Sequence, residues 1–193
     1  MKNLDILPPK LQIAFSRGRT DPVIFAEELL GMPLHDGQKK YLRQSTADIN
    51  LLVSGNRWGK SVTIAIKHIW KCFYKHGINP GNSAAHLKAI YRTANLSPDS
   101  KQLDSVFNAI RAIMTSSFAI PQPDGTLKSN ECALGFLYNP KNVRTSGRMR
   151  ISFNNNSYIN FASTGEDKGS SINADPYGYI SFDEGGRDFH MRE

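Results

Sequence analysis

The most informative stretch of this chain is Leu51-Leu52-Val53-Ser54-Gly55-Asn56-Arg57-Trp58-Gly59-Lys60-Ser61-Val62-Thr63. An apolar run leads into a loop of small residues, and the loop ends in Gly59-Lys60-Ser61 at the head of a helical pattern. Such a loop turns its backbone N–H groups toward nucleotide phosphates, and the next helix offers them its positive N-terminus. Lys60 can then reach the β- and γ-phosphate oxygens, and the Ser61 hydroxyl can ligate Mg²⁺. The stretch therefore predicts a phosphate-binding loop.

This loop departs from the usual pattern at its first position, where Ser54 replaces glycine and Gly55 follows one residue later. Its flanks match the pattern. The uncharged run Ile49–Val53 predicts a buried strand, and the apolar residues after Ser61 predict a helix of about four turns that closes near Gly77. Strand, loop and helix form the context that the motif requires. The alternative is an ordinary turn with a lysine on the surface.

A second candidate site follows another apolar run, Gly178–Phe182, which ends in Asp183 and Glu184. In a parallel sheet, the carboxyl ends of the strands face the ligand crevice. We therefore expect Asp183 to hold Mg²⁺, directly or through water, and Glu184 to orient and deprotonate the attacking water. A strand that runs into a polar turn gives the same pattern. Together, however, the loop and the carboxylates favour nucleotide hydrolysis.

Composition limits the class of protein. The chain has 193 residues and a formal net charge of +7, which favours an anionic partner such as nucleic acid, although many basic domains bind none. Its two cysteines, Cys72 and Cys132, form no disulfide framework or metal-ligand spacing and fit a reducing compartment. No apolar run approaches the length of a membrane span, and the N-terminus has no signal-peptide pattern.

Several further elements are predicted from local patterns. Asp21-Pro22 begins a helix that stops at Gly31, and Leu34–Leu42 contains the start of another. Asn79–Asn82 is a turn signal, residues 87–93 predict a strand, and Gly165–Ser171 predicts a mobile loop. Ser97-Pro98 predicts the cap of a helix with apolar positions at Leu103, Val106, Phe107, Ile110, Ile113 and Met114.

The second half of the chain predicts a long loop or insertion over residues 116–147, followed by a hairpin. The hairpin strands are Arg148–Phe153 and Tyr158–Phe161, joined by a turn at Asn154–Asn156. The order of elements predicts an α/β P-loop NTPase of the ASCE/RecA-like type, with a mostly parallel sheet flanked by helices and a β-hairpin before the acidic (Walker B) strand. Residues 1–45 form a helical lead-in to the core over residues 46–193.

These features resemble the ATPase domain of the large terminase subunit of tailed bacteriophages. The resemblance rests on the deviant loop with Arg57 inside it, on Gln38 upstream, on the hairpin Ile151–Phe161, and on Asp183-Glu184 before Gly185-Gly186. It covers the chain from about residue 22 to its end.

The resemblance implies a motor that uses ATP and Mg²⁺ to thread double-stranded DNA into a capsid. It further implies a homo-oligomeric ring on the portal protein, a small terminase subunit as partner, no membrane, and a location in the host cell cytoplasm with transient binding to the procapsid. The family continues with a coupling motif and a metal-dependent nuclease domain, so we expect this chain to be an N-terminal part and nuclease activity to reside beyond residue 193.

Site residues follow from the same resemblance. Gln38 is expected to read the adenine, with a solvent-facing helix residue as the alternative, and Arg57 to sense the γ-phosphate. The nucleotide-binding set is Ser54, Gly55, Asn56, Arg57, Trp58, Gly59, Lys60, Ser61, Val62 and Gln38; Lys60, Arg57 and Glu184 are the catalytic residues, and Ser61 and Asp183 the metal ligands.

A motor ring also needs an arginine finger. Arg148 and Arg144 are preferred over Arg150 and Arg187, although each arginine also suits a solvated or DNA-facing charge. Two other functions stay open: a helicase or another nucleic-acid-dependent P-loop ATPase, and a nucleotide-binding assembly module that does not hydrolyse ATP. Glu184 argues against the latter.

Overall fold

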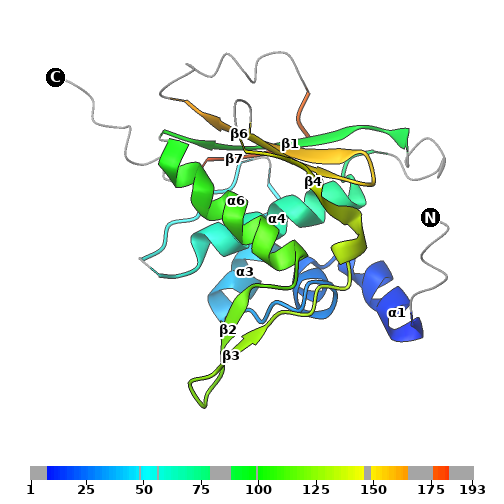
Figure 1. Ribbon diagram of the computed structural model, residues 1–193, viewed down its shortest axis with the longest axis vertical. Helices are drawn as coiled ribbons and strands as arrows, with labels where there is room; N and C mark the ends of the chain where they lie inside the picture. The colour runs from blue at the N-terminus through cyan, green and yellow to red at the C-terminus, as the bar shows by residue number, and fades with distance from the viewer. Residues whose placement is uncertain are drawn as a thin grey trace. The chain divides into compact units, whose positions relative to one another are not determined.

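The computed structural model describes residues 8–47, 49–55, 57–78, 88–98, 100–145, 149–164 and 176–182. The chain divides into two compact units, one from residues 1–70 and 109–138 and the other from residues 71–108 and 139–193. Helices α4 (Lys60–Tyr74) and α6 (Ser100–Met114) contribute residues to both units (Figure 1). No described helix is long and apolar enough to cross a membrane.

The first unit begins with short helices, namely α1 (Pro9–Gly18), α2 (Pro22–Ile24), the π-helix η1 (Phe25–Leu29) and α3 (Asp36–Gln44). Asp21 caps α2, because its carboxylate accepts the Val23 N–H at 2.9 Å. The predicted helix start at Asp21-Pro22 is therefore confirmed, and α3 confirms the helix predicted within Leu34–Leu42. The first unit buries the apolar residues Phe25, Ala26, Leu29 and Leu30 completely.

A glycine turn and a buried asparagine tie these helices to the hairpin of β2 (Ala119–Pro121) and β3 (Leu127–Ser129). Gly31 has a φ of +65°, and a Cβ there would lie 2.5 Å from the backbone nitrogen of Glu131. Only glycine fits that conformation and that space. The Asn130 side chain is 2% exposed and donates to the carbonyls of Leu30 and Ile113, both at 2.9 Å.

The two long helices match their sequence patterns. The helix predicted after Ser61 is α4, and Gly77, with a φ of +92°, follows it. The six predicted apolar positions of α6 are all buried. The predicted cap is wrong, because Ser97 is the last residue of a strand, where it pairs with Ser163, and α6 begins at Ser100.

The second unit is built on a five-stranded mixed sheet in the order β4-β5-β6-β1-β7. Strand β1 pairs in parallel with both β6 and β7, and β5 pairs antiparallel with β6. The chain is thus a mixed α/β protein. The strands are β1 (Tyr91–Ser97), β4 (Tyr138–Arg144), β5 (Met149–Phe153), β6 (Ser157–Ser163) and β7 (Tyr179–Phe182).

The hairpin β5–β6 is confirmed, with its turn at Asn154–Asn156. Side chains alternate along β6: Ile159 and Phe161 are buried, whereas Tyr158 and Asn160 are half-exposed. The buried face packs against α6, since the rings of Phe161 and Phe107 on that helix lie 5.1 Å apart.

Two predictions about the strands are wrong. The strand predicted at residues 87–93 lies at Tyr91–Ser97, because its parallel pairing with β6 extends to Ser97. The predicted loop over residues 116–147 contains the hairpin β2–β3, the 3₁₀ turn η2 (Gly135–Leu137) and β4. The predicted turn at Asn79–Asn82 and the predicted loop Gly165–Ser171 lie outside the described residues.

Candidate nucleotide-binding site

The segment before the predicted phosphate loop is not a strand. Residues 49–55 have no regular secondary structure where they are described, and the side chains of Ile49, Leu51 and Val53 are 90%, 85% and 83% exposed. The predicted buried strand Ile49–Val53 is therefore wrong. Its backbone pairs with none of the described strands, and a strand needs such a neighbour to satisfy its N–H and C=O groups.

The side chain of Lys60, at the end of the loop, contacts the backbone at the start of the loop. Lys60 is the first residue of α4, and its ammonium donates to the carbonyls of Ser54 at 3.2 Å and Gly55 at 3.4 Å. Two loop residues have left-handed backbones, Arg57 with a φ of +62° and Gly59 with a φ of +90°. These conformations turn the chain sharply into the helix. Asn56, which follows Gly55, lies outside the described residues.

Gln38 links α3 to the far end of the loop. Its side chain is 6% exposed, and its amide nitrogen donates to the Thr63 hydroxyl at 3.0 Å and to the Gly59 carbonyl at 3.5 Å. Its amide oxygen accepts the His35 N–H at 3.2 Å. Both ends of the Gln38 amide are thus engaged with the protein, and its predicted role in reading adenine stays a prediction.

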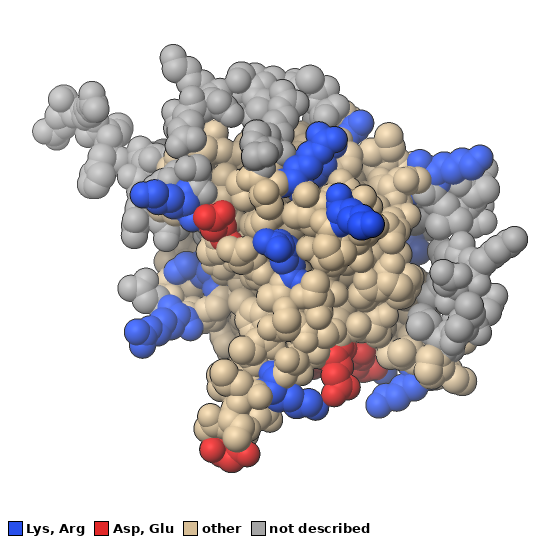
Figure 2. All heavy atoms as spheres, viewed as in Figure 1, with Lys and Arg blue, Asp and Glu red and all other residues tan. Residues whose placement is uncertain are grey.

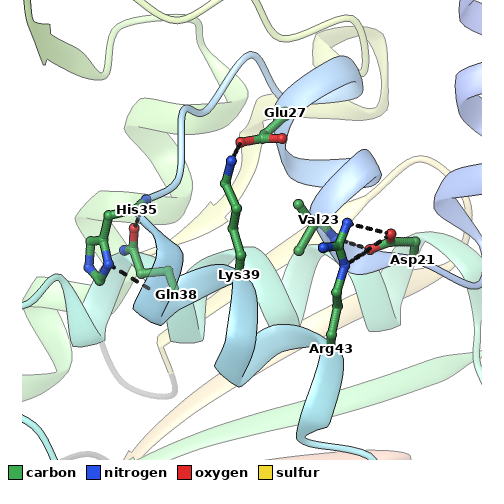
Figure 3. A network of polar contacts seen from close by, with 7 residues as sticks. All are labelled: Asp21, Val23, Glu27, His35, Gln38, Lys39 and Arg43. Atoms are coloured by element: carbon green, nitrogen blue, oxygen red, sulfur yellow. Dashed lines mark hydrogen bonds and ion pairs between the residues drawn. The ribbon is translucent and has the colours of Figure 1, made fainter.

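His35 and Trp58 make the second link between α3 and the loop. His35 Nδ1 accepts the Gln38 N–H at 3.3 Å, which completes a reciprocal cap at the start of α3 (Figure 3). Its other ring nitrogen must then carry the proton, and Nε2 donates to the Trp58 carbonyl at 2.9 Å. The His35 and Trp58 rings meet edge to face, with centroids 4.9 Å apart.

Two ion pairs hold α3 against the preceding helices (Figure 3). Lys39 lies 2.8 Å from Glu27 on η1, and Arg43 lies 2.8 Å from Asp21. Because Asp21 also accepts backbone and guanidinium hydrogen bonds, its pKa falls below the usual value despite partial burial. These pairs are partly exposed, so they orient α3 more than they stabilise it.

Behind the loop, α4 buries ionisable side chains. Lys67 is 2% exposed and donates to the carbonyl and the hydroxyl of Ser45, at 3.0 and 2.6 Å. Burial, and then the charge of Lys67, lower the pKa of His68 to about 3, so this imidazole is neutral in the folded protein.

The visible surface carries basic side chains at several places and acidic side chains at fewer (Figure 2).

Of the region that holds the predicted metal ligand Asp183 and the predicted base Glu184, the structure describes only the preceding strand, β7. This strand pairs in parallel with β1, and the Ser181 hydroxyl donates to the Asn95 side chain at 2.7 Å. Asp183 and Glu184, directly after the strand, lie outside the described residues. Within the described part of the chain, no cluster of three histidine, cysteine or acidic side chains suits a metal ion.

The other predicted site residues are placed as follows. Ser61 and Val62 lie half-buried in the first turn of α4. Arg144 is exposed at the end of β4, in the second unit, whereas the loop belongs to the first. The described residues do not include Arg148.

Sequence reasoning missed Thr63, His35 and the role of Trp58. The spacing of His35 and Gln38, three residues apart at a helix start, is a capping-box signal that could have revealed the cap. The contacts of Gln38 and His35 with the loop join residues more than twenty positions apart, and no local sequence pattern predicts them.

No family model matches this chain, and no curated protein and no solved structure match it either.

Proposed function

We propose that this chain is an ATP-hydrolysing motor domain of the kind found in the large terminase subunit of tailed bacteriophages. It would couple hydrolysis of Mg-ATP to the movement of double-stranded DNA into a capsid. The observation that carries the proposal is the loop Ser54–Ser61, which Lys60 closes from within and which α3 holds through Gln38 and His35.

The chemistry of the loop suits a polyphosphate. The first hydrogen bond within α4 joins the Thr63 N–H to the Gly59 carbonyl, so the preceding amides lie at the positive end of the helix. The Lys60 ammonium lies at the same end. The buried Ser54 hydroxyl oxygen has no hydrogen-bond partner within the described part of the chain. A buried, unsatisfied polar atom inside such a loop favours a polar ligand there.

In this proposal the loop amides and Lys60 bind the β- and γ-phosphates, and Arg57 contacts the γ-phosphate. Mg²⁺, when bound, neutralises charge on the transferring phosphoryl group. Ser61 and Asp183 would hold it. Glu184 orients the attacking water and accepts its proton, and Arg148 or Arg144 serves as the arginine finger.

The proposed partners follow from the motor. They are double-stranded DNA, the portal protein, the small terminase subunit and further copies of the chain in a ring, all in the host cell cytoplasm. The net charge of +7 supports an anionic partner.

Two substitutions test ATP binding and ATP hydrolysis separately. We expect Lys60→Ala to weaken ATP binding, measured by calorimetry, about tenfold or more, because charge-assisted hydrogen bonds to phosphate are lost. Glu184→Gln should keep ATP binding and lower the rate of phosphate release about a hundredfold or more, because a general base is lost.

Lys40→Ala is the matched control, since Lys40 is an exposed lysine on α3. It should leave both quantities unchanged. Normal ATP binding by Lys60→Ala would contradict the phosphate-loop assignment. Hydrolysis by Glu184→Gln at the unchanged rate would contradict the assignment of the base.

A further inference from the structure

Two arginines flank one tyrosine on a face of the second unit's sheet. Arg92 on β1 stands opposite Tyr158 on β6, and Arg150 on β5 stands opposite Asn160 on β6. In paired strands, opposite residues project from the same face of the sheet. Tyr158 and Asn160 are two residues apart, so all four side chains share a face. That face is opposite to the buried one formed by Ile159 and Phe161.

The contacts within this group fix both guanidinium groups. The Arg150 guanidinium carbon lies 4.2 Å from the centre of the Tyr158 ring, and that of Arg92 lies 5.7 Å from it. Arg150 Nε donates to Asn160 at 3.0 Å, and Arg92 Nε donates to the Tyr158 hydroxyl. Asn160 in turn donates to the Tyr177 hydroxyl at 2.9 Å.

These contacts hold the orientation of both guanidinium groups, and the hydrogen bond from Arg150 to Asn160 uses only its Nε. A guanidinium presents five donors in a planar fork that matches two oxygens of a phosphate. Because packing on Tyr158 already restricts the side chains, less rotamer entropy is lost when such an anion binds. Arg92, Arg150 and Tyr158 are all half-exposed.

All the charged residues within the strands of the sheet are basic. Its five strands carry four basic residues, Arg92, Lys141, Arg144 and Arg150, and no acidic residue. A surface of this kind attracts a polyanion, and the attraction comes from many phosphates rather than from one.

We propose that the face formed by Arg92, Arg150, Tyr158 and Asn160 binds the phosphate backbone of double-stranded DNA. This inference rests on the proposed function, which supplies the duplex as partner. Arg150 already covers a face of the Tyr158 ring, so the geometry favours contacts with phosphates over stacking of unpaired bases. The face therefore holds the duplex without reading its sequence.

The experiment measures binding of a fluorescein-labelled duplex of mixed sequence to the whole chain by anisotropy, without nucleotide and over a series of salt concentrations. Arg150→Ala should weaken binding about tenfold and reduce the slope of log affinity against log salt by about 1. Arg150→Lys should recover part of this loss, because it keeps the charge but not the fork. Tyr158→Phe, which removes the acceptor for Arg92 but keeps the ring, should cause a smaller loss.

Arg17→Ala is the matched control, since Arg17 is an exposed arginine on α1 in the other unit. Its affinity should equal that of the unchanged chain, and far-ultraviolet circular dichroism should show each variant folded. Equal losses for Arg17→Ala and Arg150→Ala would overturn the inference in favour of diffuse charge. Stronger binding of a single strand than of the duplex would overturn it as well.

The result also separates this inference from the proposed function. If ATP is not hydrolysed but Arg150→Ala still weakens duplex binding, the DNA-binding face stands and the motor fails. If Lys60→Ala and Glu184→Gln behave as expected while Arg150→Ala binds the duplex normally, the ATPase stands and this face is not the DNA-binding surface.

Discussion

The two flanks of the predicted phosphate loop are both apolar in sequence, and they differ completely in structure. On the upstream side, Ile49, Leu51 and Val53 are exposed in a segment without regular secondary structure. On the downstream side, α4 buries Ile64, Ile66 and Ile69, each 8% exposed or less. The loop thus joins a helix with a buried apolar face to a segment whose apolar side chains are exposed.

The difference arises because a helix forms through local hydrogen bonds, whereas a strand depends on a distant segment. A helix satisfies its backbone hydrogen bonds within itself, so α4 needs only an apolar face to bury. A strand leaves its backbone N–H and C=O groups to a neighbour. An apolar run therefore predicts burial with more certainty when it has helical periodicity.

The largest expected effect tests the comparison directly. Ile66→Ala should lower the free energy of unfolding by about 2–5 kcal/mol, because it leaves a cavity in the core. Leu51→Ala should change it by less than about 0.5 kcal/mol, because the side chain is exposed. Chemical denaturation followed by circular dichroism measures both. An effect of Leu51→Ala as large as that of Ile66→Ala would mean that residues 49–53 pack in solution.

The second test uses the buried imidazole on the same helix. Because burial lowers the folded-state pKa of His68 to about 3, the unfolded chain binds the proton first as the pH falls. The contribution of neutral His68 is complete above the unfolded pKa of about 6.5 and is lost as the pH falls toward 3, with about 2 kcal/mol gone at about pH 5.

We expect His68→Gln to remove this part of the acid sensitivity, so that its free energy of unfolding falls less between neutral pH and about pH 5 than that of the unchanged chain. The comparison uses the difference between the two pH values for each protein, which cancels any constant effect of the substitution. Parallel pH profiles for the two proteins would show that His68 is accessible to protons in the folded state.

The smallest effect concerns the link between α3 and the loop. His35→Ala removes the acceptor for the Gln38 N–H and the donor to the Trp58 carbonyl, and should cost about 1 kcal/mol of stability. In a Trp70→Phe background, where Trp58 is the single tryptophan, it should also shift the emission to longer wavelength, because the indole loses its ring contact. An unchanged emission would mean that the ring contact does not persist in solution.

Elements defined by local patterns could be predicted from the sequence. The apolar spacing in α6, the Asp21 cap of α2 and the hairpin turn at Asn154–Asn156 each join residues that are close in the chain, and all three form. The strands β2 and β3 were missed because each has three residues, too few for a period to show.

For the candidate site, the sequence named residues but not their contacts. The sequence predicted a nucleotide-binding role for the loop residues and Gln38 from their identities and spacing, and that role stays a prediction. It could not predict that the Gln38 amide contacts Thr63, or that His35 holds Trp58, because these contacts depend on the packing of α3 against the loop. Asn130, which binds carbonyls of residues as distant as Leu30, was invisible for the same reason.

By itself, the sequence determined the two long helices and the hairpin β5–β6, because periodicity and turn residues act over a few neighbouring positions. Only the tertiary structure decided that Ile49, Leu51 and Val53 stay exposed. It alone also decided that α3 contacts the loop and that Arg92 and Arg150 meet on one tyrosine. These outcomes depend on which distant segments supply a partner for each backbone and side chain, and local patterns contain no information about that choice.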